Sequence, residues 1–282
     1  MSVPEFSERQ MKLSREPGPM LFGPPEVVDG WCSLVEHERS TALEVLRGYR
    51  HEVALWYRGL SLMLDGFHGG WIIPDGEPQN QATMTRAHLL GLELSSAKAA
   101  LDMTLAGYYS IAMASIRHML EATAQSMYLM LFPESHIKWD PDDEGPGMRQ
   151  LVNQIKKELR KKGAEDVDNF EKLYDSWKYM CKGSHPSGAG LLQVIARGGD
   201  ERNIVGSVFR PDFVETIFDH GLWAMLMVLV TFPSLKVMDE EWNRRFTAWV
   251  EDRQTWRQNM LQQRGLEGDI GEGTVTSADL EF

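Results

Sequence analysis

The segment "LDMTLAGYYSIAMASIRHMLEATAQSMYLML", residues 101–131, decides the fold. It holds no proline, and apolar residues occupy nearly every face of the helix that it predicts. A helix that is apolar all round lies at the centre of a bundle and is covered by other helices. The longer proline-free region 84–131 is therefore predicted as two helices that break near Gly107, or as one long kinked helix.

Amphipathic segments surround this central region, and we predict them over residues 33–64, 148–162, 165–183, 212–232 and 234–265. The first has an apolar stripe whose steps of four and three residues are typical of a helix packed lengthwise on another: Ala42, Leu46, Tyr49, Val53, Trp56, Leu60 and Met63. The last carries Trp242, Trp249 and Trp256 at intervals of seven residues. We interpret this Trp seam as core, with a dimer interface as the alternative. The fold class is therefore all-α, a multi-helix bundle.

Three further segments differ from the helices. Residues 191–209 hold two short β-branched runs around a Gly-Gly-Asp turn, which predicts a small β-hairpin insertion. Residues 1–30 are rich in proline and glycine and are predicted as a flexible arm. Residues 265–282 are acidic and glycine-rich and are predicted as a disordered tail. The remainder, residues 31–264, is predicted as a single helical domain.

Composition limits the classes of partner. The formal net charge of −12 repels phosphate backbones, so nucleic-acid binding is disfavoured. The exception is one basic run, which is more simply a solvated helix face: Lys156, Lys157, Arg160, Lys161 and Lys162. Two cysteines without a metal-type spacing are interpreted as reduced thiols of a cytoplasmic protein. We expect no signal peptide, because the N-terminus has neither a basic region nor an apolar region after it. We expect no membrane span, because the longest apolar run, 222–232, is too short.

Metal-binding patterns are incomplete in this chain. Two His-Glu dipeptides, at His37 and His51, have no second histidine four positions later, as the zinc-protease helix requires. The acidic stretch after Trp139 resembles the start of a calcium loop, but its twelfth position is Leu151 rather than a glutamate. We therefore expect no metal and no cofactor.

Two polar clusters stand out against this apolar background. Arg117 and Glu121 lie one turn apart on a helix face of small residues, where they must be paired because unpaired buried charge costs several kcal/mol. They are either a structural ion pair or part of a binding or catalytic cleft. Ser184 and His185 follow a predicted helix C-terminus, where the dipole favours a protonated imidazole. We predict that Arg117, Glu121 and His185 converge, since one carboxylate cannot saturate the five donors of arginine.

The stretch of residues 97–130 followed by "YDSWKYMCKGSHPS" resembles a bacterial and phage family of uncharacterised all-helical proteins near the HEPN superfamily. The resemblance covers about Ser95 to Phe232. It implies a helical bundle, frequent dimerisation and a link to stress or phage defence. It carries Arg117, Glu121, His185 and, less directly, Ser184 onto this chain as site residues. The ribonucleases of that superfamily have an arginine four to six positions before a histidine, whereas this chain has Lys182 and no arginine before His185.

The expected function follows from these clusters. It is a regulatory or interaction module, expected to be a homodimer, whose Arg/Glu/His cleft holds a small anionic ligand or a segment of a protein partner. The alternative is a metal-independent endoribonuclease toxin of HEPN type, with His185 as general acid or base and Arg117 stabilising the phosphorane. The third is a small-molecule enzyme that transfers protons through a Glu121–His185 pair.

Overall fold

The computed structural model describes residues 25–68, 81–138, 147–163, 167, 169–184, 195–197, 203–205, 209–232 and 238–263. Within these residues the chain is a bundle of eight α-helices with one 3₁₀ segment, η1, which spans Pro133–Lys138. The helices are α3 (Pro25–Gly48), α4 (Arg50–His68), α5 (Gln81–Leu105), α6 (Tyr109–Leu131), α7 (Met148–Lys161), α8 (Asn169–Ser184), α10 (Pro211–Leu229) and α11 (Glu240–Gln263). The predicted all-α bundle is confirmed.

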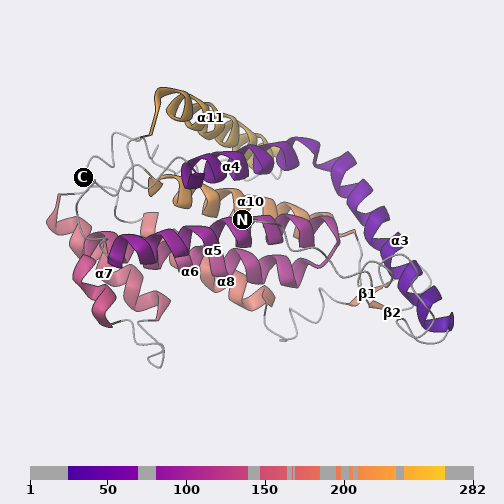
Figure 1. Cartoon of the computed structure of the whole chain (residues 1–282). Coiled ribbons are helices and arrows are strands. Elements are labelled where there is room, and N and C mark those ends of the chain that lie inside the picture. Colours follow the sequence, from indigo (N-terminus) through magenta and orange to yellow (C-terminus); the bar gives the residue numbers. More distant parts are fainter. Residues whose placement is uncertain are drawn as a thin grey trace, which may run out of the picture.

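The helices lie in layers around α6. Figure 1 shows α11 above α4 and α10, then α5 and α6, with α7 and α8 below. Helix α6 packs against α5, α7, α8 and α10, and most of its side chains are buried. The segment that is apolar all round is thus the central helix, as expected.

The turn between α5 and α6 makes these two helices an antiparallel hairpin. Gly107 has a φ of 79°, a left-handed conformation that an L side chain disfavours. The backbone N–H of Tyr108 donates to the carbonyl oxygen of Met103 (2.8 Å), and that of Gly107 donates to Thr104 (3.1 Å). This is the Schellman pattern that ends a helix at glycine. Of the two predicted arrangements, the chain adopts two helices.

The Trp seam of α11 is core within a single chain. Trp242, Trp249 and Trp256 are all buried, and their indole N–H groups donate to α4. The acceptors are the carbonyl oxygens of Leu62 (3.0 Å) and Leu55 (2.8 Å) and the carboxylate of Glu52 (2.8 Å), in that order. Residue numbers increase along α11 while those of the acceptors in α4 decrease, so the two helices are antiparallel. The interpretation as core is confirmed.

Glycines allow large rings to sit against helix backbones. Trp56 of α4 is fully buried, its indole N–H donates to the carbonyl oxygen of Ala97 in α5 (3.0 Å), and its ring covers Gly221 of α10. A Cβ at Gly221 would lie closer than 3.0 Å to this ring. Gly59 faces Trp249 and Met225 in a similar way. These contacts hold α4, α5, α10 and α11 at short distances.

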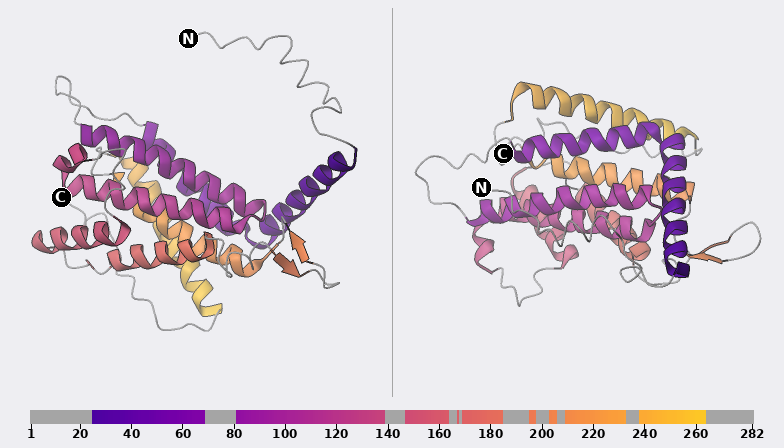
Figure 2. Two further views of the ribbon diagram at one scale, coloured as in Figure 1. Left: turned by 90° about the horizontal axis from the view of Figure 1, so that it is seen from below. Right: turned by 45° about the vertical axis from the view of Figure 1, so that its right-hand side comes forward.

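The helix predicted over residues 33–64 is in fact two helices. Tyr49 separates α3 from α4, and Figure 2 shows α3 pointing away from the axis of α4. The hydrogen bonds from Tyr49 N–H to Val45 and from Val53 N–H to Tyr49 continue across the bend, so no break in periodicity marks it. The apolar stripe is buried from Val53 onward, whereas Leu46 is exposed. The prediction of one helix was wrong because the chain bends at Tyr49, and most of α3 points away from the bundle.

The predicted terminal segments and insertion fall largely outside the described residues. Helix α3 begins at Pro25, so the arm predicted over residues 1–30 is too long by several residues, and residues 1–24 and the predicted tail 265–282 lie outside the description. Strands β1 (Ile195–Arg197) and β2 (Asn203–Val205) pair antiparallel, with Ala196 opposite Ile204. The residues between and beside them are not described, and the hairpin over 191–209 stays a prediction.

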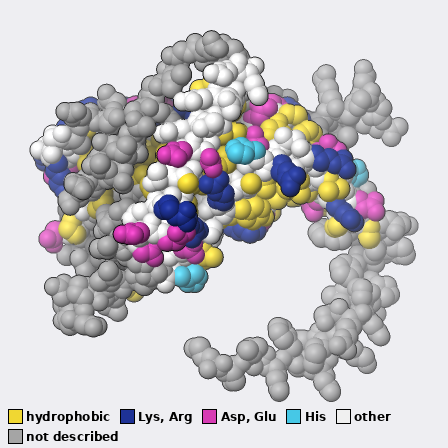
Figure 3. Space-filling view, turned by 90° about the horizontal axis from the view of Figure 1, so that it is seen from above, with side chains coloured by type: hydrophobic (Ala, Val, Ile, Leu, Met, Phe, Trp, Pro, Cys, Tyr) yellow, Lys and Arg dark blue, Asp and Glu magenta, His cyan; other side chains and the backbone are white. Residues whose placement is uncertain are grey.

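Charges of both signs cover the surface where α4 and α11 meet. Figure 3 shows Lys and Arg interspersed with Asp and Glu over the upper face of the molecule. Arg58 pairs with Asp252 (2.6 Å) and Arg245 pairs with Asp65 (2.7 Å), and both pairs join α4 to α11. Such exposed pairs each contribute little to stability. Among the described helices, none combines the length and the apolar character that crossing a lipid bilayer requires.

The contact between Trp56 and Gly221 predicts a stability defect. We expect Gly221→Ala to lower the free energy of unfolding by about 2 kcal/mol, because overpacking costs about 1–3 kcal/mol and exceeds the gain of up to about 1 kcal/mol from alanine in a helix. Gly91→Ala is the matched control, since its Cβ would lie 3.8 Å from Phe67, an ordinary contact. Urea denaturation measures both variants. Equal or higher stability of Gly221→Ala would contradict the close packing.

Candidate functional site

The first predicted cluster joins α6 to α8. Arg117 Nε lies 3.6 Å from Glu121 Oε1, and the Trp177 indole N–H of α8 donates to the same carboxylate at 2.7 Å. An Arg117 terminal nitrogen is 3.2 Å from His118 Nε2. The arginine side chain therefore reaches toward its sequence neighbour as well as toward Glu121. The tertiary partner of Glu121 is the indole of Trp177.

The second predicted cluster is described only in part. Ser184 ends α8, and its hydroxyl donates to the carbonyl oxygen of Cys181 (3.3 Å), as in a capping role. Burial raises the pKa of the Cys181 thiol, Arg117 lowers it and Glu121 raises it further, so Cys181 lies beside the ion pair. His185 lies outside the described residues. Its convergence with Arg117 and Glu121 stays a prediction.

The contact of Trp177 with Glu121 fixes the orientation of α8. Residues 173, 177, 180, 181 and 184 point toward the α6 side at helical spacing. Residues 172, 175, 176 and 179 lie on a different face of the same helix. That second face therefore borders the gap between α8 and α10, which both pack on α6 and make few contacts with each other.

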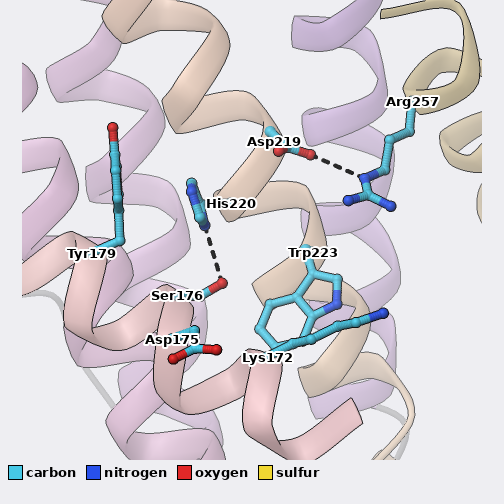
Figure 4. A pocket seen from close by; sticks show the side chains of 8 residues that line it. All are labelled: Lys172, Asp175, Ser176, Tyr179, Asp219, His220, Trp223 and Arg257. Atoms are coloured by element: carbon cyan, nitrogen blue, oxygen red, sulfur yellow. Dashed lines mark hydrogen bonds and ion pairs between the residues drawn. The ribbon is translucent and has the colours of Figure 1, made fainter. Parts of the chain in front are cut away.

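A cavity of about 370 Å³ occupies this gap. Figure 4 shows its lining: Lys172, Asp175, Ser176 and Tyr179 from α8, Asp219, His220 and Trp223 from α10, and Arg257 from α11. Its size lies in the range of about 300–1,000 Å³ that is usual for small-molecule sites. We call it the α8–α10 pocket.

A serine–histidine pair lies at one side of the α8–α10 pocket. His220 Nδ1 is 3.1 Å from the Ser176 hydroxyl oxygen, and the imidazole stacks on the Tyr179 ring with 5.0 Å between ring centres (Figure 4). Burial lowers the pKa of His220; Asp219 opposes this shift and Arg257 adds to it. A neutral ring with its proton on Nε2 accepts from Ser176 through Nδ1. The pair therefore offers a polarised hydroxyl and a neutral imidazole to a bound molecule.

Charged groups of both signs complete the α8–α10 pocket. Arg257 Nε lies 3.4 Å from Asp219 Oδ1, and both side chains are about one-quarter exposed. Arg257 thus brings a guanidinium, a group that attracts oxyanions, to the wall of the pocket. Lys172 adds an ammonium group, and Asp175 is exposed to solvent, which screens its charge. The arrangement suits an anionic group with hydrogen-bonding atoms next to it.

A buried carboxyl group, which the sequence analysis missed, lies between α5 and α6. Glu93 is completely buried, and burial raises its pKa to about 8. Thr123, whose hydroxyl donates to the Met119 carbonyl oxygen, and Arg86 act in the opposite direction. Burial lowers the pKa of Arg86 to about 10, and Glu93 opposes this. Glu93 is thus protonated at neutral pH, as expected for a desolvated carboxyl group.

Metal-ligating side chains do not gather in the described part of the chain: no group of three or more His, Cys, Asp or Glu there could hold an ion. Comparison with protein-family models, with curated proteins and with solved structures finds no match to this chain. The resemblance to a family near the HEPN superfamily therefore stays an expectation. What the chain does must be argued from its own side chains.

The α8–α10 pocket is not the site that was predicted from the sequence, because its residues carry no comparable sequence signal. Arg117 and Glu121 stand out in the sequence because they are polar residues on an apolar helix. Ser176 and His220 are 44 positions apart, on helices whose polar faces look ordinary. Only the segment "DHGLW", which begins at Asp219 and places a histidine just before the longest apolar run, could have indicated the pocket.

The environment of His220 predicts its titration. Its pKa is lowered, so the folded state takes up this proton at a lower pH than the unfolded state. Stability from the neutral ring is therefore complete above about pH 6.5 and is lost as pH falls toward the folded pKa. We expect the His220 resonance in NMR spectra, assigned by its loss in His220→Gln, to titrate with a midpoint below about 6.5. A midpoint at or above this value would show that the ring is not desolvated.

Proposed function

We propose that this protein is a helical-bundle binding module of regulatory type, whose α8–α10 pocket takes a small anionic ligand. The single observation that supports it best is the convergence of Lys172, Arg257 and the Ser176–His220 pair on one cavity of about 370 Å³. Two cationic groups favour an anion, and the hydroxyl and imidazole give direction to its other polar atoms.

The construction of the α8–α10 pocket supports binding. Helices α8 and α10 are both held by α6, one through Trp177 and Glu121 and the other through its buried apolar face. The two walls are therefore fixed before a ligand enters, and a preformed site loses less conformational entropy on binding. Trp223 and the Tyr179 ring give apolar surface for the body of the ligand.

This proposal can be tested by ligand-induced stabilisation. We expect at least one of inorganic phosphate, citrate, L-glutamate and AMP to raise the melting temperature of the wild-type protein, because a ligand that binds only the folded state stabilises it. Lys172→Gln should weaken that binding about tenfold, the loss of about 1.4 kcal/mol expected for one charge-assisted contact. Differential scanning fluorimetry and calorimetric titration provide the two measurements.

Lys178→Gln is the matched control. Lys178 is exposed on the same helix and does not line the α8–α10 pocket. Its replacement by glutamine removes the same charge as Lys172→Gln. Equal responses of Lys172→Gln and Lys178→Gln, or no stabilisation of wild type by any of the four anions at millimolar concentration, would contradict the proposal.

A second candidate function rests on the Ser176–His220 distance of 3.1 Å, which matches a nucleophile next to its general base. In such a hydrolase Ser176 Oγ attacks the acyl carbon while His220 takes its proton, and the ester C–O bond breaks to release p-nitrophenolate. Water then attacks the acetyl-serine, which releases acetate and restores the serine hydroxyl. We expect any hydrolysis of p-nitrophenyl acetate to fall about a hundredfold or more in Ser176→Ala. Ser95→Ala, on the exposed side of α5, should keep the wild-type rate. A wild-type rate in Ser176→Ala would exclude this candidate.

The other expectations keep their place as proposals. A homodimer, a protein partner, a cytoplasmic location and a link to stress or phage defence rest on the sequence alone. The endoribonuclease alternative and the Glu121–His185 enzyme both need His185, which lies outside the described residues. In the basic run, Lys156 pairs with Glu171 (2.9 Å) and Lys161 with Glu158 (2.8 Å), so part of that charge is neutralised within the protein.

A further inference from the structure

A second and larger cavity, of about 670 Å³, lies where α3 meets α4. Its lining comes from the α3–α4 junction, from α10 and Phe209 two residues before it, and from the last turns of α11: Gly48, Tyr49, Glu52, Phe209, Glu215, Trp256, Asn259, Met260 and Gln263. We call it the junction pocket. Glu215 and Asp219 of the α8–α10 pocket are one helical turn apart on α10, so the two pockets are neighbours with different linings.

Two carboxylates are held in place in the junction pocket by aromatic side chains. The Tyr49 hydroxyl donates to Glu215 (3.1 Å), and the Trp256 indole N–H donates to Glu52 (2.8 Å). Each bond fixes the position of a carboxylate that lines the junction pocket. Both carboxylates therefore present negative charge at its wall.

Aromatic rings form the rest of the wall. Tyr49 packs against Phe209 with 6.4 Å between ring centres, and Trp256 stands on the α11 side. The faces of such rings carry negative electrostatic potential and attract cations within about 6 Å. Asn259 and Gln263 add neutral amides, and no basic side chain is among the described residues that line the junction pocket.

The field inside the junction pocket is negative. Burial raises the pKa of Tyr49, and the charges of Glu215 and Glu52 raise it further. The part of this pKa shift that comes from Glu215 and Glu52 reflects a negative potential that would also favour a bound cation. The formal net charge of −12 attracts cations to the protein as a whole.

We propose that the junction pocket binds an organic cation, an ammonium or guanidinium group attached to an apolar body. The charged group lies between Glu52 and Glu215, and the apolar body lies against Tyr49, Phe209 and Trp256. A metal ion is a poorer fit, because a cavity of this size leaves it hydrated and gives the rings nothing to contact. The site does not depend on the anion pocket proposed above.

The test compares two probes of one shape. Phenethylamine is protonated at neutral pH, and 2-phenylethanol is its neutral counterpart. Calorimetric titration of the full chain should show the amine binding at least tenfold more tightly than the alcohol, with an affinity that falls as sodium chloride is raised. Equal binding of the two, or no binding of the amine at millimolar concentration, would overturn the proposal.

Variants locate the site. Glu52→Gln and Glu215→Gln keep an oxygen that can accept from the ring donors, and each should weaken amine binding about tenfold. Glu251→Gln makes the same change at an exposed position of α11 outside the junction pocket and should bind like wild type. Lys172→Gln should also leave amine binding unchanged, so the two proposed sites can fail separately. Wild-type affinity in both pocket variants would overturn the assignment, and the two-probe comparison on wild type holds even if a variant folds poorly.

Discussion

The packing of Trp56, a residue of α4, against α5 and α10 is the contact on which the rest of the bundle depends. Its indole N–H is bonded to α5 and its ring covers Gly221 of α10, while α4 itself receives the tryptophans of α11. A fully buried tryptophan removes a large apolar surface from water, and its one polar atom is satisfied. Because helix α10 is placed by this ring, the positions of Asp219, His220 and Glu215 follow from it.

The two pockets have a common structural origin. Helices of unequal direction cannot stay in contact along their whole length, so gaps open where they diverge. One gap lies between α8 and α10, and the other lies where α3 turns away at Tyr49. Polar and charged side chains line both gaps because water reaches them. The linings of the two pockets share no residue, so each pocket can be changed by mutation without altering the other's walls.

Much of the helical architecture could be predicted from the sequence, because apolar periodicity and glycine positions are local signals. The break at Gly107 and the core position of Trp242, Trp249 and Trp256 are examples. The bend at Tyr49 was not predictable in this way, since the hydrogen bonds of the helix continue through it. The sites were harder still: Ser176 meets His220 only because α8 and α10 share a neighbour, and periodicity does not say which helices are neighbours.

The buried Glu93 has a consequence for how the protein carries its charge. With a pKa of about 8, this carboxyl group is neutral in the folded protein at pH 7, whereas the unfolded chain leaves it ionised. Folding therefore takes up one proton from the buffer at this residue, and the linkage makes folding less favourable as the pH rises from 4.5 to about 8. At this residue the folded molecule is one unit less negative than its formal charge of −12 implies, because Glu93 is neutral where it is buried between α5 and α6.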